Sequence, residues 1–502
     1  GLPVHGRRPL RDPGPRMSGE GDPALVGLTG AGGMLGTEVV RAAEERGLAL
    51  AAWIHQGEPP FDLWPVDIRR FGRPHRDIEW VRARTLELYA KHYGISWPSE
   101  EHRSCRPARR SPLYDHLAAA GACFGEKLGW ERPNWFAPDG IEPRDVYSFE
   151  RPNWFPHVGR EHRSARERVA VFDQSSFAKF ELAGPGAESA LSWLCANDVA
   201  KPPGSVTYTQ MLNRRGGIEC DLTVARLAHD RFYIVTGTAF ATHDFHWISR
   251  NIPAGLEAGL RDVTEDWAVL SLMGPSAREV LGSVTDDDVS DRALPFASCR
   301  LLDVAGVATR VLRITYVGEL GFELHLPVGA AIQVYDALMG SGARHGIVNA
   351  GYRAIESLRL EKGYRAWAAD ITPNDTPYEA GLGWAVKADS DVAFLGREEL
   401  ARRLRTGSVR RLAGFTVADP DVMLHGRETI LRDSERVGWL TSGGWGHTIA
   451  KGIGYGYVND PEGVDEAFLT SGAYELEVAG RIVAAELHLR PLYDPSGHRV
   501  RS

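Results

Sequence analysis

Three side chains that could hold a polar ligand are spaced along residues 314–324. Tyr316, Glu319 and Glu323 belong to a run that begins like a strand and is broken by two glycines. A phenol can donate and accept a hydrogen bond, and a carboxylate can accept two N–H donors from one planar edge. The run therefore predicts a ligand-binding turn, with Glu319 on its solvent side in a structural role. The alternative is a plain hairpin with charged edge residues.

A second strand-like run, broken by a pair of glycines, contains an isolated acid. Gly216 and Gly217 precede Asp221, which is set among apolar residues of the run 218–224. An aspartate is ionised at neutral pH, so it can act as a base or stabilise positive charge without a large pKa shift. The glycine pair leaves room for a flat ligand. The pattern predicts that Asp221 is catalytic, and the alternative is an ordinary turn acid at a strand end.

A third segment, residues 357–379, predicts a helix followed by a proline-containing loop. Arg359 lies on this helix between two leucines. Its guanidinium could reach a ligand, or it could pair with an acid such as Glu361 or Asp370. Both interpretations stay open.

In order, spacing and residue types, these segments resemble the folate-binding core of the glycine-cleavage T-protein (aminomethyltransferase) family. The resemblance implies that Asp221 assists the folate nitrogen that attacks a one-carbon electrophile. It also implies that Tyr316 and Glu323 hold the pterin and that Arg359 supports the pocket. Family members line the pterin cleft with residues just before the second run, and the matching positions here are Tyr208, Gln210 and Met211.

Flanking motifs resemble one branch of that family. Residues 62–71, 111–116 and 129–136 look like the middle of the dimethylglycine and sarcosine dehydrogenases or oxidases, in which a large flavin domain precedes a T-protein-like half. The resemblance runs from about residue 40 to the C-terminus and leaves out most of the flavin domain. It implies that this chain alone does not bind FAD and needs a separate flavoprotein partner, or that the sequence is a fragment.

The resemblance implies tetrahydrofolate-dependent transfer of a one-carbon unit from a methylamine-derived donor. The product would be 5,10-methylenetetrahydrofolate, formed during demethylation of dimethylglycine or sarcosine. One alternative is a non-catalytic regulatory or adaptor protein with the same fold. The other is an aminomethyltransferase that takes its one-carbon unit from a lipoyl carrier protein, although stand-alone T-proteins lack a segment like residues 60–136.

The elements that must position these residues form no regular alternation of strands and helices, which predicts an α+β fold. We expect a disordered N-terminal segment over residues 1–24 and a remnant of a flavin-dependent oxidoreductase, with its central region, over 25–145. A folate-binding domain over 146–400 and a small β-barrel over 401–502 would follow. A glycine-rich loop at 30–36 begins like a dinucleotide-binding fold, but too few residues follow for a Rossmann sheet. We interpret it as the end of the flavin domain.

Composition excludes several classes of function. The formal charge of −8 over 502 residues counts against a binder of nucleic acid or anionic membranes. No stretch approaches the roughly 20 apolar residues of a membrane-spanning helix. The 5 cysteines form no CxxC motif and suit a reducing compartment. We expect a soluble protein of the cytoplasm, or of the mitochondrial matrix if the source is eukaryotic.

Two further patterns predict structure rather than chemistry. The histidine spacing indicates no metal site, and His243, His246 and His325 are expected to be solvated or packed. The hexapeptide Glu-Arg-Pro-Asn-Trp-Phe occurs at 131–136 and again at 150–155. We expect its tryptophans, Trp135 and Trp154, to pack in the core, with ligand binding as the alternative.

Overall fold

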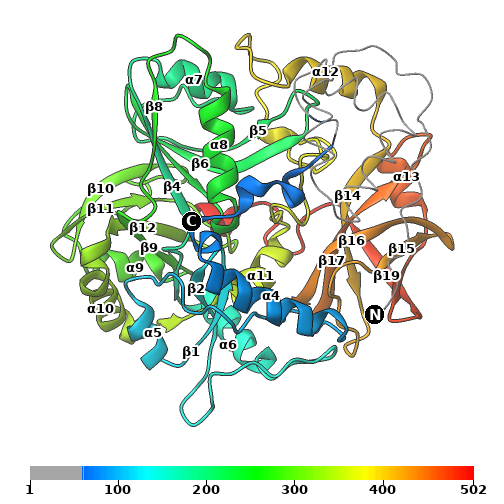
Figure 1. Cartoon of the computed structure of the whole chain (residues 1–502), viewed down its shortest axis with the longest axis horizontal. Helices are drawn as coiled ribbons and strands as arrows, with labels where there is room; N and C mark the ends of the chain where they lie inside the picture. Colours follow the sequence, from blue (N-terminus) through cyan, green and yellow to red (C-terminus); the bar gives the residue numbers. More distant parts are fainter. Residues whose placement is uncertain (1–58, 60) are drawn as a thin grey trace, which may run out of the picture. The chain divides into compact units, whose positions relative to one another are not determined.

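The computed structural model describes residue 59 and residues 61–502 (Figure 1). The expected disordered segment at 1–24 and the glycine-rich loop at 30–36 lie outside the described residues. The fold below is that of the compact unit Asp62–Ser502.

Short helical turns and a hairpin begin this unit. The elements are η1 (Trp64–Val66), η2 (Ile68–Arg70), η3 (Arg73–Arg76), α4 (Ile78–His92), α5 (Tyr114–Ala119), β1 (Ala122–Lys127) and β2 (Trp130–Phe136). Asp77 caps α4, because its carboxylate accepts a hydrogen bond from the Glu79 amide at 2.9 Å. Among the described residues, no helix combines the length and apolar character needed to cross a bilayer.

A five-stranded antiparallel sheet carries Asp221. Its order is β5 (Val206–Leu212), β6 (Ile218–Ala228), β7 (Arg231–Thr236), β4 (Ala178–Ala183) and β8 (Gly259–Asp262), and one face is covered by α7 (Ala187–Leu194) and α8 (Ala241–Asn251). Successive side chains of a strand point to opposite faces. Cys220, Leu222 and Val224 therefore lie in the core beneath these helices, and Asp221 and Thr223 lie on the other face.

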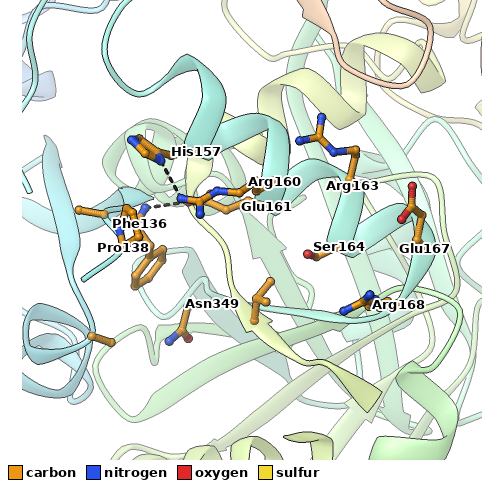
Figure 2. Close-up of a pocket in the computed structure, with 13 residues that line it drawn as sticks. Phe136, Pro138, His157, Arg160, Glu161, Arg163, Ser164, Glu167, Arg168 and Asn349 are labelled. Carbon is orange, nitrogen blue, oxygen red and sulfur yellow. Dashed lines mark hydrogen bonds between the residues drawn. The ribbon is translucent and has the colours of Figure 1, made fainter. Parts of the chain in front are cut away.

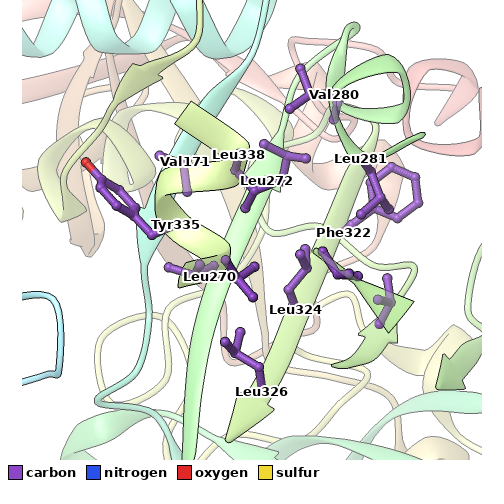
Figure 3. Packing of buried hydrophobic residues seen from close by; sticks show 14 of the residues in the cluster. Val171, Leu270, Leu272, Val280, Leu281, Phe322, Leu324, Leu326, Tyr335 and Leu338 are labelled. Atoms are coloured by element: carbon purple, nitrogen blue, oxygen red, sulfur yellow. The ribbon is translucent and has the colours of Figure 1, made fainter. Parts of the chain in front are cut away.

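A six-stranded sheet carries Glu323. Its order is β10 (Cys299–Val304), β11 (Val307–Leu312), β12 (Gly321–Pro327), β9 (Trp267–Met273), β3 (Ala170–Asp173) and β13 (Val348–Asn349), and its helices are α9 (Ala277–Gly282) and α10 (Ala331–Gly342). Figure 3 shows Phe322 and Leu324 of β12 packed with Leu281 of α9 and Leu338 of α10. Each such side chain contributes about 1.5–3 kcal/mol through burial.

The opposite faces of the two sheets meet at a polar contact. His325, two residues after Glu323, alternates along β12 with the core residues Leu324 and Leu326, so it points to the other face of the sheet. The distance between its Nδ1 and the hydroxyl of Tyr233 on β7 is 3.1 Å. Tyr233 shares its face of the first sheet with Asp221, because it pairs with Ala225, four residues further along β6. Asp221 and Glu323 therefore belong to facing surfaces.

The two copies of the repeated hexapeptide adopt different structures. Residues 131–136 lie in β2, whereas residues 150–155 lead into α6 (Phe155–Glu167). Trp135 and Trp154 are both buried, at 0% and 8% exposure, as the sequence predicts. The same ion pair holds both rings: Asp145 accepts from Trp135 Nε1 at 2.8 Å, and Arg353, its partner, lies over the ring of Trp154.

The C-terminal strands close into a barrel, coloured orange to red in Figure 1. Its strand order is β14 (Arg410–Val417), β17 (Lys451–Asn459), β16 (Glu435–Gly446), β15 (Thr429–Arg432), β18 (Tyr474–Val478) and β19 (Arg481–His488). The helices of this part of the chain include α12 (Arg397–Thr406), α13 (Glu466–Ser471) and α14 (His498–Arg501). The predicted α+β fold with a C-terminal barrel is confirmed.

Helix α11 (Tyr352–Lys362) joins the barrel to the sheets. Its Ser357 hydroxyl donates to the Trp445 carbonyl at 2.6 Å, and its Glu361 carboxylate accepts from the Thr448 amide at 2.7 Å. Trp445 and Thr448 lie on and just after barrel strand β16. The helix ends at Gly363, whose φ of 69° favours a residue without a Cβ.

Candidate functional site

Asp221 is bonded to two neutral donors. The Tyr208 hydroxyl donates to Asp221 Oδ1 at 2.6 Å, and Gln210 Nε2 donates to the same oxygen at 3.0 Å. Both donors lie on β5, where Gln210 pairs directly with Asp221, so all three side chains share one face of the sheet. Neither donor carries a charge, so the negative charge of Asp221 is not neutralised within the cluster.

This environment changes the acidity of Asp221. Burial raises the pKa of its carboxyl to about 6, and the hydrogen bonds from Tyr208 and Gln210 oppose that rise. Asp221 is therefore mostly ionised at pH 7 but close to its titration range. A base with a pKa near the working pH is well suited to accept a proton during catalysis.

The Tyr208 hydroxyl is expected to influence the pH below which the rate of one-carbon transfer falls, because it affects the pKa of Asp221. Tyr208→Phe removes a donor that favours the carboxylate, so the pKa of Asp221 should rise further. A neutral hydrogen bond is worth about 0.5–1.5 kcal/mol, which corresponds to at most about one pH unit. The pH profile of one-carbon transfer measures the shift. Tyr335→Phe, which removes a hydroxyl bonded to Asn349, is the control, and an unchanged midpoint in Tyr208→Phe would contradict the assignment.

Tyr316 lies in the loop between β11 and β12 and is close to this cluster. Its hydroxyl donates to the Arg365 carbonyl at 2.8 Å, and its ring stacks on Tyr364 at 5.6 Å between centroids. Burial raises the pKa of Tyr316, and the charge of Asp221 contributes to that rise. The sequence did not single out Tyr364 and Arg365. Their position directly after the glycine that ends α11 was the available signal.

Arg359 is held by protein acids. Its guanidinium donates to Asp370 Oδ2 at 2.7 Å and to Glu356 Oε2 at 2.9 Å, and it is 3% exposed. Barrel residues complete the arrangement, since the Thr441 hydroxyl donates to Asp370 Oδ1. These contacts favour the structural alternative for Arg359, in which it links α11 to the barrel.

Glu323 has a different environment. Its carboxylate lies 3.4 Å from His325 Nε2, and burial lowers the pKa of His325, so this histidine is neutral at pH 7. Among the described residues, no hydrogen bond or ion pair joins Glu323 to Asp221 or Tyr316. A carboxylate in this position could accept N–H donors from a ligand.

Two residues of the predicted turn and cleft lie elsewhere. The Met211 side chain is buried with Cys220 beneath α7 and α8, because strand alternation turns it away from Gln210. Glu319 is not on the solvent side of its turn, as the sequence predicted, but is 1% exposed. It accepts a hydrogen bond from Tyr493 and lies 3.6 Å from Arg166 Nη1, so its role is structural.

Unpartnered polar atoms mark the surroundings of Asp221. Among the described residues, no hydrogen-bond partner lies within reach of the buried atoms Gln210 Oε1 and Trp367 Nε1. Trp367 and Tyr208 pack against the same apolar cluster, and Trp384, 70% exposed, stacks on Tyr208 at 5.6 Å. A buried donor and a buried acceptor without partners suit a ligand that has both kinds of group, as a pterin does.

A pocket of 480 Å³ lies beside α6, away from these residues. Figure 2 shows His157, Arg160, Ser164 and Arg168 of this region around it, with Asn349 on the far side. None of the residues proposed from the sequence lines this pocket. We place the candidate site at Asp221 because the chemistry of the side chains, rather than the size of a concavity, decides what can react there.

Comparison with known proteins identifies the fold. Residues 113–390 match the GCVT N-terminal domain, and residues 410–494 match the glycine cleavage T-protein C-terminal barrel domain. The first match alone covers more than half of the chain. The chain belongs to the glycine-cleavage T-protein family. Residues 56–111 of this T-protein family member match the FAD dependent oxidoreductase central domain.

Two relatives and one solved structure are similar to this chain over most of its length. Human mitochondrial sarcosine dehydrogenase is 40% identical over 95% of this chain and 55% of its own length. The mouse mitochondrial pyruvate dehydrogenase phosphatase regulatory subunit is 34% identical over 95% of this chain and 56% of its own length. The glycine cleavage system aminomethyltransferase T from Bartonella henselae aligns with a TM-score of 0.66 and 28% identity over 77% of this chain and 99% of its own.

The chain therefore spans about half the length of the curated relatives it matches. The resemblance to the T-protein family and to its dehydrogenase branch, predicted from the sequence, is confirmed. The boundaries at residues 24, 145 and 400 remain a proposal.

Proposed function

We propose that this protein catalyses tetrahydrofolate-dependent one-carbon transfer linked to demethylation of sarcosine or dimethylglycine, and forms 5,10-methylenetetrahydrofolate. The observation that carries the proposal is the half-buried Asp221 carboxylate, held by two neutral donors beside an unpartnered acceptor on Gln210 and an unpartnered donor on Trp367. Membership of the T-protein family supports the same reaction class.

In the proposed reaction, a folate nitrogen attacks the carbon of an iminium and forms a new C–N bond. The proton that this nitrogen loses passes to Asp221, whose carboxylate is the nearest unpaired base of the cluster. The product amine takes that proton back as its C–N bond breaks, and the second folate nitrogen closes the methylene bridge and releases its own proton. Tyr316 and Glu323 would bind the pterin, and the Tyr208 hydroxyl would orient Asp221.

We also propose that the iminium comes from a flavoprotein domain or subunit, so that amine oxidation by FAD takes place outside the described residues. The match of residues 56–111 to the FAD dependent oxidoreductase central domain supports this. In this region Ile68, Tyr93 and Ile95 are exposed by 79%, 82% and 79%. We propose that the protein lies in the mitochondrial matrix if its source is eukaryotic, since both relatives are mitochondrial. For any other source we propose the cytoplasm.

A titration with tetrahydrofolate tests the pterin contact of Glu323. Glu323→Gln keeps the shape of the side chain but replaces one acceptor oxygen with a donor. The affinity for tetrahydrofolate should therefore fall by about 10–100-fold, because one charge-assisted hydrogen bond of about 1.5–3 kcal/mol is lost. Calorimetry or tryptophan fluorescence quenching measures the dissociation constant. Glu265→Gln, a surface carboxylate with a 75% exposed side chain, is the control. Equal affinity of wild type and Glu323→Gln would remove Glu323 from the site.

The similarity to a phosphatase regulatory subunit supports a second candidate, a regulatory protein that keeps the fold without catalysis. The similarity to an aminomethyltransferase of the glycine cleavage system supports a third, in which a lipoyl carrier protein donates the one-carbon unit. Tetrahydrofolate binding separates the first and third candidates from the second. Activity with a lipoyl-bound aminomethyl donor separates the third from the first.

A further inference from the structure

We propose that Cys220, His243 and Asp244 form a zinc-binding site between β6 and α8. Each residue offers one ligand atom, and the three atoms lie within 4.8 Å of one another. The distance between His243 Nδ1 and Asp244 Oδ1 is 2.8 Å. All three residues are buried on the helix-covered side of β6, opposite the face that carries Asp221. The site is separate from the proposed one-carbon site.

The ligand set selects the ion. Zinc binds thiolate, imidazole and carboxylate ligands, and three protein ligands plus a water complete a tetrahedral centre. Calcium and magnesium prefer sites made of oxygen atoms alone, which this cluster is not. One thiolate and one carboxylate also balance the two positive charges of Zn²⁺, so the bound ion would leave no net charge in the apolar core.

Neighbouring groups already orient the ligands. His243 Nε2 lies 3.2 Å from Glu219 Oε1, and the Thr236 hydroxyl donates to Asp244 Oδ2 at 2.5 Å. These contacts use the far atom of each ligand, whereas His243 Nδ1 and Asp244 Oδ1 are hydrogen-bonded to each other, a contact that a bound ion would replace. A histidine ligand in proteins commonly has a carboxylate on its second nitrogen, as Glu219 provides here.

Without metal, the cluster holds protons that zinc would displace. Binding of Zn²⁺ would release one proton from His243 Nδ1 and one from the Cys220 thiol. The His243 and Glu219 side chains are 7% and 14% exposed, which gives an ion a short path from solvent.

The sequence offered no signal for this site because its ligands come from two elements separated by β7. Only the pairing of β6 in the sheet and the packing of α8 over it bring Cys220 next to His243. An ion bound here would tie α8 to β6. Since Asp221 directly follows Cys220, it would also fix the strand that carries the proposed base.

Metal analysis of the full chain tests the proposal. The protein is loaded with zinc, passed through gel filtration and analysed by plasma emission spectrometry, and a cobalt-loaded sample is examined by absorption spectroscopy. We expect one zinc per chain and a cobalt–thiolate charge-transfer band in the near ultraviolet. Cys220→Ser should lower zinc affinity by about tenfold or more and abolish the band, because a thiolate ligand is lost.

The matched control is Cys195→Ser. Cys195 is buried in the same apolar core but is not one of the three ligands, so this variant should keep both the metal and the band. A folded wild-type chain that retains no zinc after loading would overturn the proposal, as would Cys220→Ser with unchanged zinc affinity and cobalt spectrum. If Cys220→Ser does not fold, wild-type protein is used for the test. Chelation should lower the melting temperature of the zinc-loaded protein and erase the band of the cobalt-loaded protein. An unaltered spectrum would overturn the proposal.

Discussion

Asp221→Asn is expected to slow one-carbon transfer by about 10²–10⁴-fold, the range by which a positioned base accelerates proton transfer. The amide of asparagine fits the same space and can still accept from Tyr208, but it cannot take up a proton. Binding of tetrahydrofolate should change little, since Tyr316 and Glu323 are untouched. Transfer from a chemically prepared iminium donor, measured with saturating tetrahydrofolate, gives the rate. Asp230→Asn, an exposed acid at the turn after β6, is the control.

The pH dependence adds an independent check on Asp221. Because the active form is the carboxylate and its pKa is about 6, the rate should fall as the pH drops below 6. The raised pKa also means that Asp221 contributes stability only at low pH, and that this contribution is lost as pH rises through 6. Asp221→Asn should therefore melt no lower than wild type at pH 8. A large fall in melting temperature, or a rate equal to that of wild type, would reject Asp221 as the base.

Glu361→Gln is expected to destabilise the protein by about 3–5 kcal/mol, because it removes the nearer of the two acids paired with the buried Arg166 and leaves only Glu319, 3.6 Å away. Glu361 Oε2 lies 3.1 Å from Arg166 Nη2 and 3.3 Å from His162 Nε2, and its other oxygen accepts from the Thr448 amide. The side chain is fully buried. Denaturant unfolding measures the loss. Glu399→Gln, which breaks a surface pair with Arg402, should change stability by only about 0.2–1 kcal/mol.

Lowering the pH should also remove the stabilisation that the Glu361 carboxylate provides. Burial acts to raise the pKa of Glu361, but the hydrogen bond and charge of His162 and the charge of Arg166 lower it to about 2. A group whose pKa is lower in the folded state stabilises that state at pH values above its ordinary pKa of 4.5. The contribution is then lost between pH 4.5 and 2. The stability difference between wild type and Glu361→Gln should narrow over that interval, and a constant difference would show that packing, rather than charge, is responsible.

The sequence predicted those parts of the fold that local pattern and family motifs determine. The alternation on β6, the helix around Arg359 and the strands of the barrel follow from residue periodicity. The family resemblance implied that Tyr208, Gln210 and Met211 line a cleft near Asp221, and the structure shows that the first two bond to Asp221.

Long-range packing explains what the sequence missed. Met211 alternates with Gln210, so its place in the core follows from strand register, which family motifs alone do not give. Glu319 is buried because Tyr493, more than 170 residues later, folds back onto it. The ligands of the proposed zinc site likewise come together only in three dimensions, whereas Asp370 was already among the acids expected beside Arg359.

Helix α11 bears on how this chain can be divided. Its Glu361 and Lys362 are buried, and each has a partner beyond residue 440: Glu361 bonds to the Thr448 amide, and Lys362 pairs with Asp494 at 2.8 Å. A fragment that ended near residue 400 would keep both buried side chains and lose these two partners. The two family matches cover residues 113–390 and 410–494. They do not mark separate folding units, and the sheets and the barrel are expected to gain their structure together.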